Sequence, residues 1–96
     1  MAKIYIVVVN ESIDDLDFAC KDNKKRDVLK AFRSIDTAID FMCEVYSARI
    51  EDLKRTGSSV EYCYINNQGG CIFWKNPMEQ LYGVTDYIII ERELAD

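Results

Sequence analysis

Four cysteines and a scatter of carboxylates are the residues of this sequence that could carry chemistry. The cysteines are Cys20, Cys43, Cys63 and Cys71. The chain contains no histidine, which excludes Ser-His-Asp and Cys-His nucleophile systems. No two cysteines form a Cys-x-x-Cys pair, so a zinc site would need four scattered thiolates. We therefore expect reduced thiols that pack as small apolar side chains in a cytosolic protein, and no metal site.

The remaining reactive stretches are weak as catalytic or metal sites. Cys71 follows two glycines and could be presented at a tight turn, but no base is indicated beside it. Residues 14–17, "DDLD", resemble half a calcium loop without its glycine or its distal glutamate. Glu91 and Glu93 fall on one face of a strand end, where solvated carboxylates are usual. No phosphate-binding glycine motif is present, so we predict a protein that is not an enzyme and has no cofactor.

Residues 60–76, "VEYCYINNQGGCIFWKN", predict a hairpin with aromatic strands. The strands are 60–65 and 71–75, and "NNQGG" supplies residues that tolerate positive φ at the turn. A five-residue loop would place Tyr62 opposite Trp74. A four-residue loop would group Tyr62, Tyr64, Cys71 and Phe73 on one face. In either register Tyr62 and Tyr64 share a face, because alternate strand residues point the same way.

Three further strands are expected to hold this hairpin. Residues 3–9, "KIYIVVV", are apolar on both faces, which is typical of a strand inside a sheet rather than of a signal peptide. Residues 28–33 predict a second strand, antiparallel to the first, and residues 85–94 a final one. Residues 10–27 would then form a long connection. In it, Ser12 could cap one helical turn that carries Ile13, Leu16 and Cys20.

Residues 34–57 predict the one long helix. Ser34 suits the N-cap, Asp36 lies in the first turn where the helix dipole favours an anion, and Gly57 suits the end. Apolar residues recur at spacings of three and four, which places them on one stripe of the helix. These residues are Ile35, Ala38, Ile39, Met42, Cys43, Tyr46, Ile50 and Leu53.

Together these elements predict a single α+β domain, residues 1–96, with an antiparallel-rich sheet of four to five strands. One helix can cover only one face of such a sheet. The other face would be covered by the 10–27 connection, by another copy of the chain or by a foreign partner. The side chains expected to form this contact surface are Tyr5, Tyr62, Tyr64, Phe73, Trp74 and Tyr87.

The charge of the chain limits its partners. The net charge is −5, from 17 acidic and 12 basic side chains, which disfavours general binding to nucleic-acid backbones. Two alternatives stay open. The sheet aromatics could stack on single-stranded nucleic acid, or a small anionic ligand such as a nucleotide could lie between the 10–27 connection and the sheet. In the nucleic-acid alternative, phosphates would be held by basic residues of the 21–33 segment, namely Lys24, Lys25, Arg26, Lys30 and Arg33.

The order of parts resembles a loose group of short phage and mobile-element proteins. They open on a strand like "KIYIV", enter the helix through an F-x-S-x-x-x-A-x-x-F step, and close on a Y-x-I-x-x-x-E-L strand. The matching residues here are Phe32, Ser34, Ala38 and Phe41, then Tyr87, Ile89, Glu93 and Leu94. The resemblance implies no activity and no catalytic residue. It implies a small accessory protein that acts by binding, such as an inhibitor of a host enzyme or defence complex.

We therefore predict a non-enzymatic binding protein in the cytosol of a bacterial host, homodimeric through the sheet face or an edge strand. Tyr62, Tyr64 and Trp74 would be its apolar anchors, and the acidic 11–17 segment would steer basic partners towards it. No stretch of the sequence has the roughly 18 consecutive apolar residues of a membrane span, so no membrane partner is expected.

Overall fold

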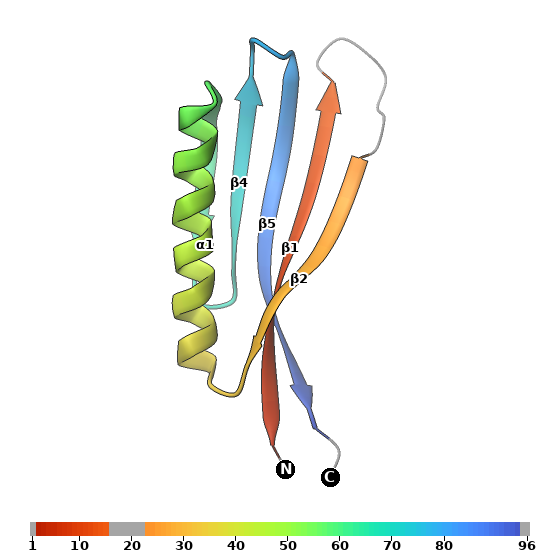
Figure 1. Ribbon diagram of the computed structural model, residues 1–96, viewed down its shortest axis with the longest axis vertical. Coiled ribbons are helices and arrows are strands. Elements are labelled where there is room, and N and C mark those ends of the chain that lie inside the picture. The colour runs from red at the N-terminus through yellow and green to blue at the C-terminus, as the bar shows by residue number, and fades with distance from the viewer. Residues whose placement is uncertain (1, 16–22, 95–96) are drawn as a thin grey trace.

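The computed structural model describes residues 2–15 and 23–94 of the chain. Its elements are β1 (Lys3–Asp15), β2 (Asn23–Phe32), α1 (Ile35–Arg55), β3 (Ser59–Ile65), β4 (Gly69–Asn76) and β5 (Leu81–Glu93). The five strands form one antiparallel sheet in the order β2-β1-β5-β4-β3, and α1 packs on one of its faces (Figure 1). The predicted α+β architecture is confirmed, with α1 carrying the chain from one sheet edge to the other.

The first two strands are longer than the sequence predicted. Residues 10–15 continue β1, of which residues 10–13 pair with both β2 and β5 and residues 14 and 15 pair with β5. Residues 23–27 already belong to β2. The prediction of one long connection over 10–27 is therefore wrong for both of its ends. Ser12 and Ile13 lie in a strand, not in a helical turn, while Leu16 and Cys20 are outside the described residues. Charged side chains resemble a loop in sequence, but an edge strand such as β2 tolerates them because they reach solvent.

The helix forms as predicted, from local signals. The Ser34 hydroxyl accepts a hydrogen bond from the Thr37 N–H at 3.5 Å, and Asp36 occupies the first turn. At the other end Gly57 adopts a φ of 86°, a left-handed conformation that glycine adopts without steric cost. The predicted apolar stripe faces the sheet. Its buried members are Ala38, Met42, Tyr46 and Leu53.

The core lies between α1 and the inner face of the central strands. Val7 from β1, Ile72 and Trp74 from β4 and Tyr87 from β5 are buried there. The Trp74 ring lies over Gly83 of the neighbouring strand, and a Cβ at position 83 would overlap that ring. A glycine is therefore required at this position for the tryptophan to lie flat on the sheet.

A polar network ties the second half of α1 to this core. Arg49 donates to Glu11 of β1 and to Asp52 on its own helix, at 3.1 Å in both cases. The Thr85 hydroxyl donates to the other oxygen of Glu11 at 3.4 Å and accepts from Trp74 Nε1 at 3.3 Å. These bonds link α1, β1, β4 and β5, so they orient the helix on the sheet.

Candidate functional site: the open face of the sheet

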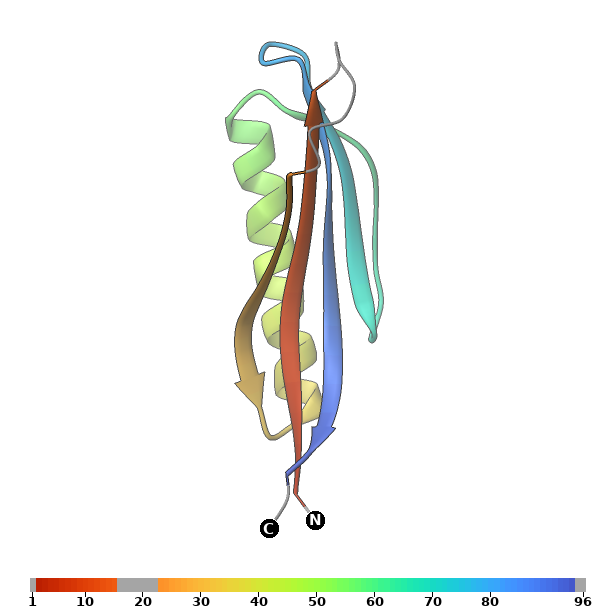
Figure 2. The same ribbon diagram turned by 90° about the vertical axis from the view of Figure 1, so that its right-hand side faces the viewer.

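The candidate site is the face of the sheet opposite α1. Val7 and Ile72 point under α1, so Val8, Cys71 and Phe73 point to the opposite side. Figure 2 shows the helix on one side of the sheet only. Among residues 2–15 and 23–94, no element packs on the other side, which we call the open face.

Two apolar patches occupy the open face. The aliphatic patch runs over β2, β1 and β5, and its residues are Val28, Ile6, Val8, Ile88 and Ile90. The aromatic patch runs over β5, β4 and β3, and its residues are Val84, Tyr82, Phe73, Tyr62 and Tyr64. Val28 is 68% exposed, and Tyr62 and Tyr64 are 62% and 48% exposed. Large apolar side chains grouped and exposed in this way are typical of interaction surfaces.

The aromatic patch depends on the hairpin register. Ile65 pairs with Gly70, Tyr64 with Cys71 and Tyr62 with Phe73, which is the register of the four-residue loop. The Asn66 side chain holds that loop by accepting from the N–H groups of residues 68 and 69, at 2.8 and 3.0 Å. The structure therefore decides between the two predicted registers.

Within this register the aromatic rings contact one another along the face. The Tyr62 and Tyr64 rings lie edge to face with centroids 6.0 Å apart. Phe73 and Tyr82 are tilted at 6.5 Å. Such spacings are those of stabilising aromatic pairs, so the patch is an ordered surface of rings and not four independent side chains.

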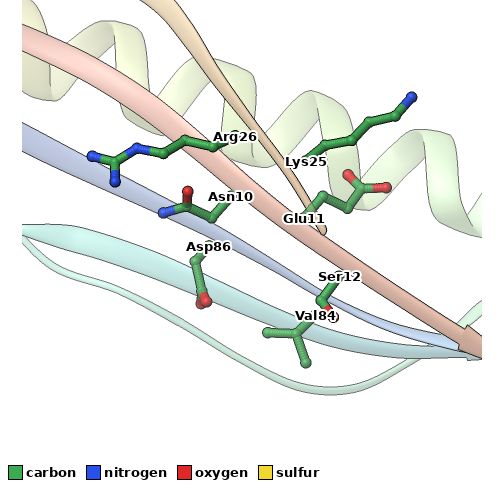
Figure 3. A pocket seen from close by; sticks show the side chains of 7 residues that line it. All are labelled: Asn10, Glu11, Ser12, Lys25, Arg26, Val84 and Asp86. Carbon is green, nitrogen blue, oxygen red and sulfur yellow. The ribbon is translucent and has the colours of Figure 1, made fainter. Parts of the chain in front are cut away.

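A polar row separates the two patches. Arg26, Asn10, Asp86 and Cys71 are consecutive cross-strand neighbours on β2, β1, β5 and β4. Arg26, Asn10 and Asp86 line a hollow of about 380 Å³ on the open face, and Figure 3 shows their side chains on three adjacent strands. A partner that covers the open face must therefore supply hydrogen bonds for this row as well as apolar area.

The polar row also determines the protonation state of the Cys71 thiol. Burial, then a hydrogen bond with Asp86 and the charge of that carboxylate, raise the pKa of Cys71 from its ordinary 9.0 to about 12. A thiol with such a pKa stays protonated at neutral pH, and only the thiolate is a good nucleophile. Cys71 is thus a protonated, polar side chain of the open face and not a nucleophile at neutral pH.

The six predicted contact residues do not share one face. Tyr62, Tyr64 and Phe73 lie together on the open face. Trp74 and Tyr87 are each only 4% exposed and belong to the core beneath α1, and Tyr5 packs against that same core. Trp74 and Tyr87 are therefore buried away from the open face, and the half-buried Tyr5 lies on the helix-covered side, while the contact of any of the six residues with a partner stays a prediction. The four-residue loop pairs Tyr62 with Phe73, and the register shift between Val60 and Tyr62 then puts Trp74 opposite Val60. Alternation in β5 turns Tyr87 inward.

Sequence reasoning missed the aliphatic patch as part of the surface. Its signal was present in "KIYIVVV" and "DYIIIE", where both faces of each strand are apolar. That pattern shows that a second face exists. It does not say which alternate set lies under the helix, because the choice depends on the pairing of strands far apart in the sequence.

The basic residues lie far from the exposed tyrosines. Lys25 and Lys30 pair with β1 residues of the helix-covered side, and the Lys30 amine lies 5.4 Å from the Phe32 ring centroid. β2 and β3 are the two edges of the sheet, four strand spacings or roughly 19 Å apart. A nucleic-acid site that combines Tyr62 and Tyr64 with the basic segment would have to cross the whole face, past the carboxylate of Asp86.

Comparison with protein-family models, curated proteins and solved structures finds no match to this chain. In the part of the chain that the structure describes, α1 lacks the apolar length to cross a membrane. The same described residues contain no group of three side chains placed to bind a metal ion.

Proposed function

We propose that this chain is a non-enzymatic protein-binding protein whose open face is its contact surface. One observation carries the proposal: the face presents nine exposed or half-buried apolar or aromatic residues on five strands, around the buried Val8, and no described element covers it. A five-stranded face about 24 Å wide and some nine residues long measures roughly 700 Å², close to one side of a standard protein interface.

The composition of the face supports a protein partner. Exposed tyrosines such as Tyr62 and Tyr64 bury large area on binding at little cost in conformational entropy. The polar row adds one cation, Arg26, and one anion, Asp86, which would fix the orientation of a partner.

We further propose, from the sequence resemblance, that the partner is a host protein or defence complex modulated by a phage or mobile-element accessory protein in the bacterial cytosol.

The test is capture of partners from a bacterial lysate with wild type and with a Tyr62→Ala/Tyr64→Ala double variant. Both side chains are exposed, so the variant is expected to keep its fold. If the tyrosines are anchors, the affinity for the captured protein falls by at least about 2 kcal/mol, measured by calorimetry with the purified partner.

A matched control separates this face from general stickiness. Met78 is 89% exposed and lies in the turn between β4 and β5, away from the open face. Met78→Ala removes a comparable exposed apolar side chain and should leave the affinity unchanged. Equal recovery of the partner by wild type and the tyrosine variant would overturn the proposal.

A further inference from the structure

The two edges of the sheet differ in how they are protected. Edge strands expose unpaired N–H and C=O groups, and natural proteins discourage pairing there with charged side chains. β2 carries such charges, with Lys25, Arg26, Asp27 and Lys30 among its residues. β3, at the other edge, carries only Glu61 among its seven residues.

Glu61 does not interrupt the unprotected part of β3. It falls at the register shift between Val60 and Tyr62, so the bulge and the charge lie together at the start of the strand. Residues 62–65, "YCYI", pair regularly with β4 and carry no charge. Tyr62, Cys63 and Tyr64 are all exposed. β3 thus ends the sheet with a regularly paired edge that is uncharged over residues 62–65, the kind on which another strand can add.

The hydrogen-bond pattern shows which groups this edge offers. Asn66 N–H donates to the Gly69 carbonyl at 2.9 Å, so the backbone groups of Asn66 point towards β4. Backbone groups alternate sides along an antiparallel strand, so those of Tyr64 and Tyr62 also point to β4. The N–H and C=O groups of Cys63 and Ile65 point outward, and no strand of the described chain pairs with them.

We propose that a second copy of this chain pairs with β3 edge to edge, giving a dimer with one continuous ten-stranded antiparallel sheet. A two-fold axis at Tyr64 relates the two β3 strands. The N–H and C=O groups of Cys63 and Ile65 in each copy then all form hydrogen bonds with the same groups of the other copy. Cys63 of one copy then pairs with Ile65 of the other, and the two Tyr64 side chains are directly opposite. We therefore name a second copy of the chain as the partner at this edge, since the β3 edge of one copy offers the donors and acceptors that the β3 edge of another copy needs.

The dimer differs from one that stacks the two open faces. Edge pairing leaves both open faces on the same side of the extended sheet, free for the proposed partner. The inference therefore does not depend on the proposed function, and the two can fail separately: oligomeric state tests this one and partner affinity tests the other. The contact is short, so self-association is expected in the weak range, above roughly micromolar concentrations.

Light scattering over a concentration series tests the pairing, with Cys63→Pro as the disrupting variant. Proline at 63 removes an N–H that points outward, so the bonds between β3 and β4 remain and edge strands accept such a residue. We expect wild type to approach twice the mass of one chain and Cys63→Pro to remain at one. Cys63→Thr keeps the N–H and suits a strand, and it should dimerise like wild type.

Cross-linking identifies the edge without relying on the proline variant. In a protein that keeps Cys63 as its only thiol, edge pairing places the two Cα atoms about 8 Å apart, within reach of a short bismaleimide. In a matched protein that keeps only Cys71, which lies opposite Tyr64 on β4, three strand spacings separate the two Cys71 residues by about 14 Å. We expect covalent dimers from the first protein and few from the second.

The two proteins also distinguish the alternatives. Cys71 points to the open face and Cys63 to the side of α1, so a face-to-face dimer would reverse the cross-linking result. That reversal, or a wild type that stays monomeric up to roughly millimolar concentration, would overturn the proposal. A Cys63→Pro variant that is folded by circular dichroism and still dimerises would overturn it as well.

Discussion

Cys71 is the side chain whose chemistry the fold changes most clearly. Its neighbour across the strands is Asp86, and burial together with that carboxylate raises the pKa of the thiol to about 12. In the sequence, a cysteine after two glycines could equally have been an exposed, reactive thiol. The structure instead makes it a protonated hydrogen-bonding group in the polar row of the open face.

A single-thiol protein that keeps only Cys71 should therefore react slowly with iodoacetamide at pH 8. Its rate should rise with pH beyond pH 10, because the reactive thiolate appears only as the pH approaches the raised pKa. Asp86→Asn removes a negative charge that opposes ionisation, so the pKa should fall. The rate at pH 8 should then increase about tenfold for each unit of that fall.

The matched protein that keeps only Cys63 provides the control, because this thiol is exposed and should react faster at pH 8. Mass spectrometry of the alkylated chains gives all three rates. A Cys71 thiol that reacts as fast as Cys63 at pH 8, with no effect of Asp86→Asn, would contradict the assignment.

At the scale of elements, the contact between β4 and β5 depends on one glycine. Trp74 covers Gly83 and reaches Thr85, which in turn contacts Glu11. This stack explains how a tryptophan fits between the helix and the sheet. It also couples the packing of β4 to the network that holds Arg49 of α1.

Gly83→Ala should consequently destabilise the fold by about 1–3 kcal/mol, the usual cost of overpacking a core position. The added methyl group must displace the indole ring, so the fluorescence of the only tryptophan should change in the native state as well. Urea unfolding followed by circular dichroism measures the free energy. An unchanged midpoint and spectrum would show that the ring does not depend on the glycine.

At the scale of the whole molecule, the sheet has one face built for stability and one available for contact. The core beneath α1 contains most of the fully buried side chains, including Ile72, while Phe73 next to it is only half-buried on the open face. Removing a side chain should therefore have different consequences on the two faces of the same strand.

Ile72→Ala should cost about 2–5 kcal/mol, as expected for a fully buried aliphatic residue. Phe73→Ala should cost less in stability, because part of its ring is already in water, and should instead weaken the binding of a partner to the open face. Urea unfolding and partner titration of both variants test this division. A greater loss of stability at Phe73 than at Ile72 would mean that the open face is part of the core.

The sequence by itself determined the elements whose signals are local. Ser34, the stripe from Ala38 to Leu53 and Gly57 predict α1, because capping and helical periodicity involve residues a few positions apart. Alternation and turn residues predict the hairpin, and the excess of apolar strand residues predicts a face that one helix cannot cover. Whether that face binds a partner protein stays a prediction.

Only the tertiary structure decided which residues form that face. A shift of one residue in register turns a strand over, and the register of β1 against β5 or β3 against β4 depends on contacts across the whole sheet. For this reason Tyr62 and Tyr64 are exposed while Trp74 and Tyr87 are buried, although all four are aromatic residues in predicted strands. The same long-range pairing converts the charged ends of the 10–27 segment into strands, because β5 pairs with β1 over its full length and β1 in turn pairs with β2 over residues 5–13.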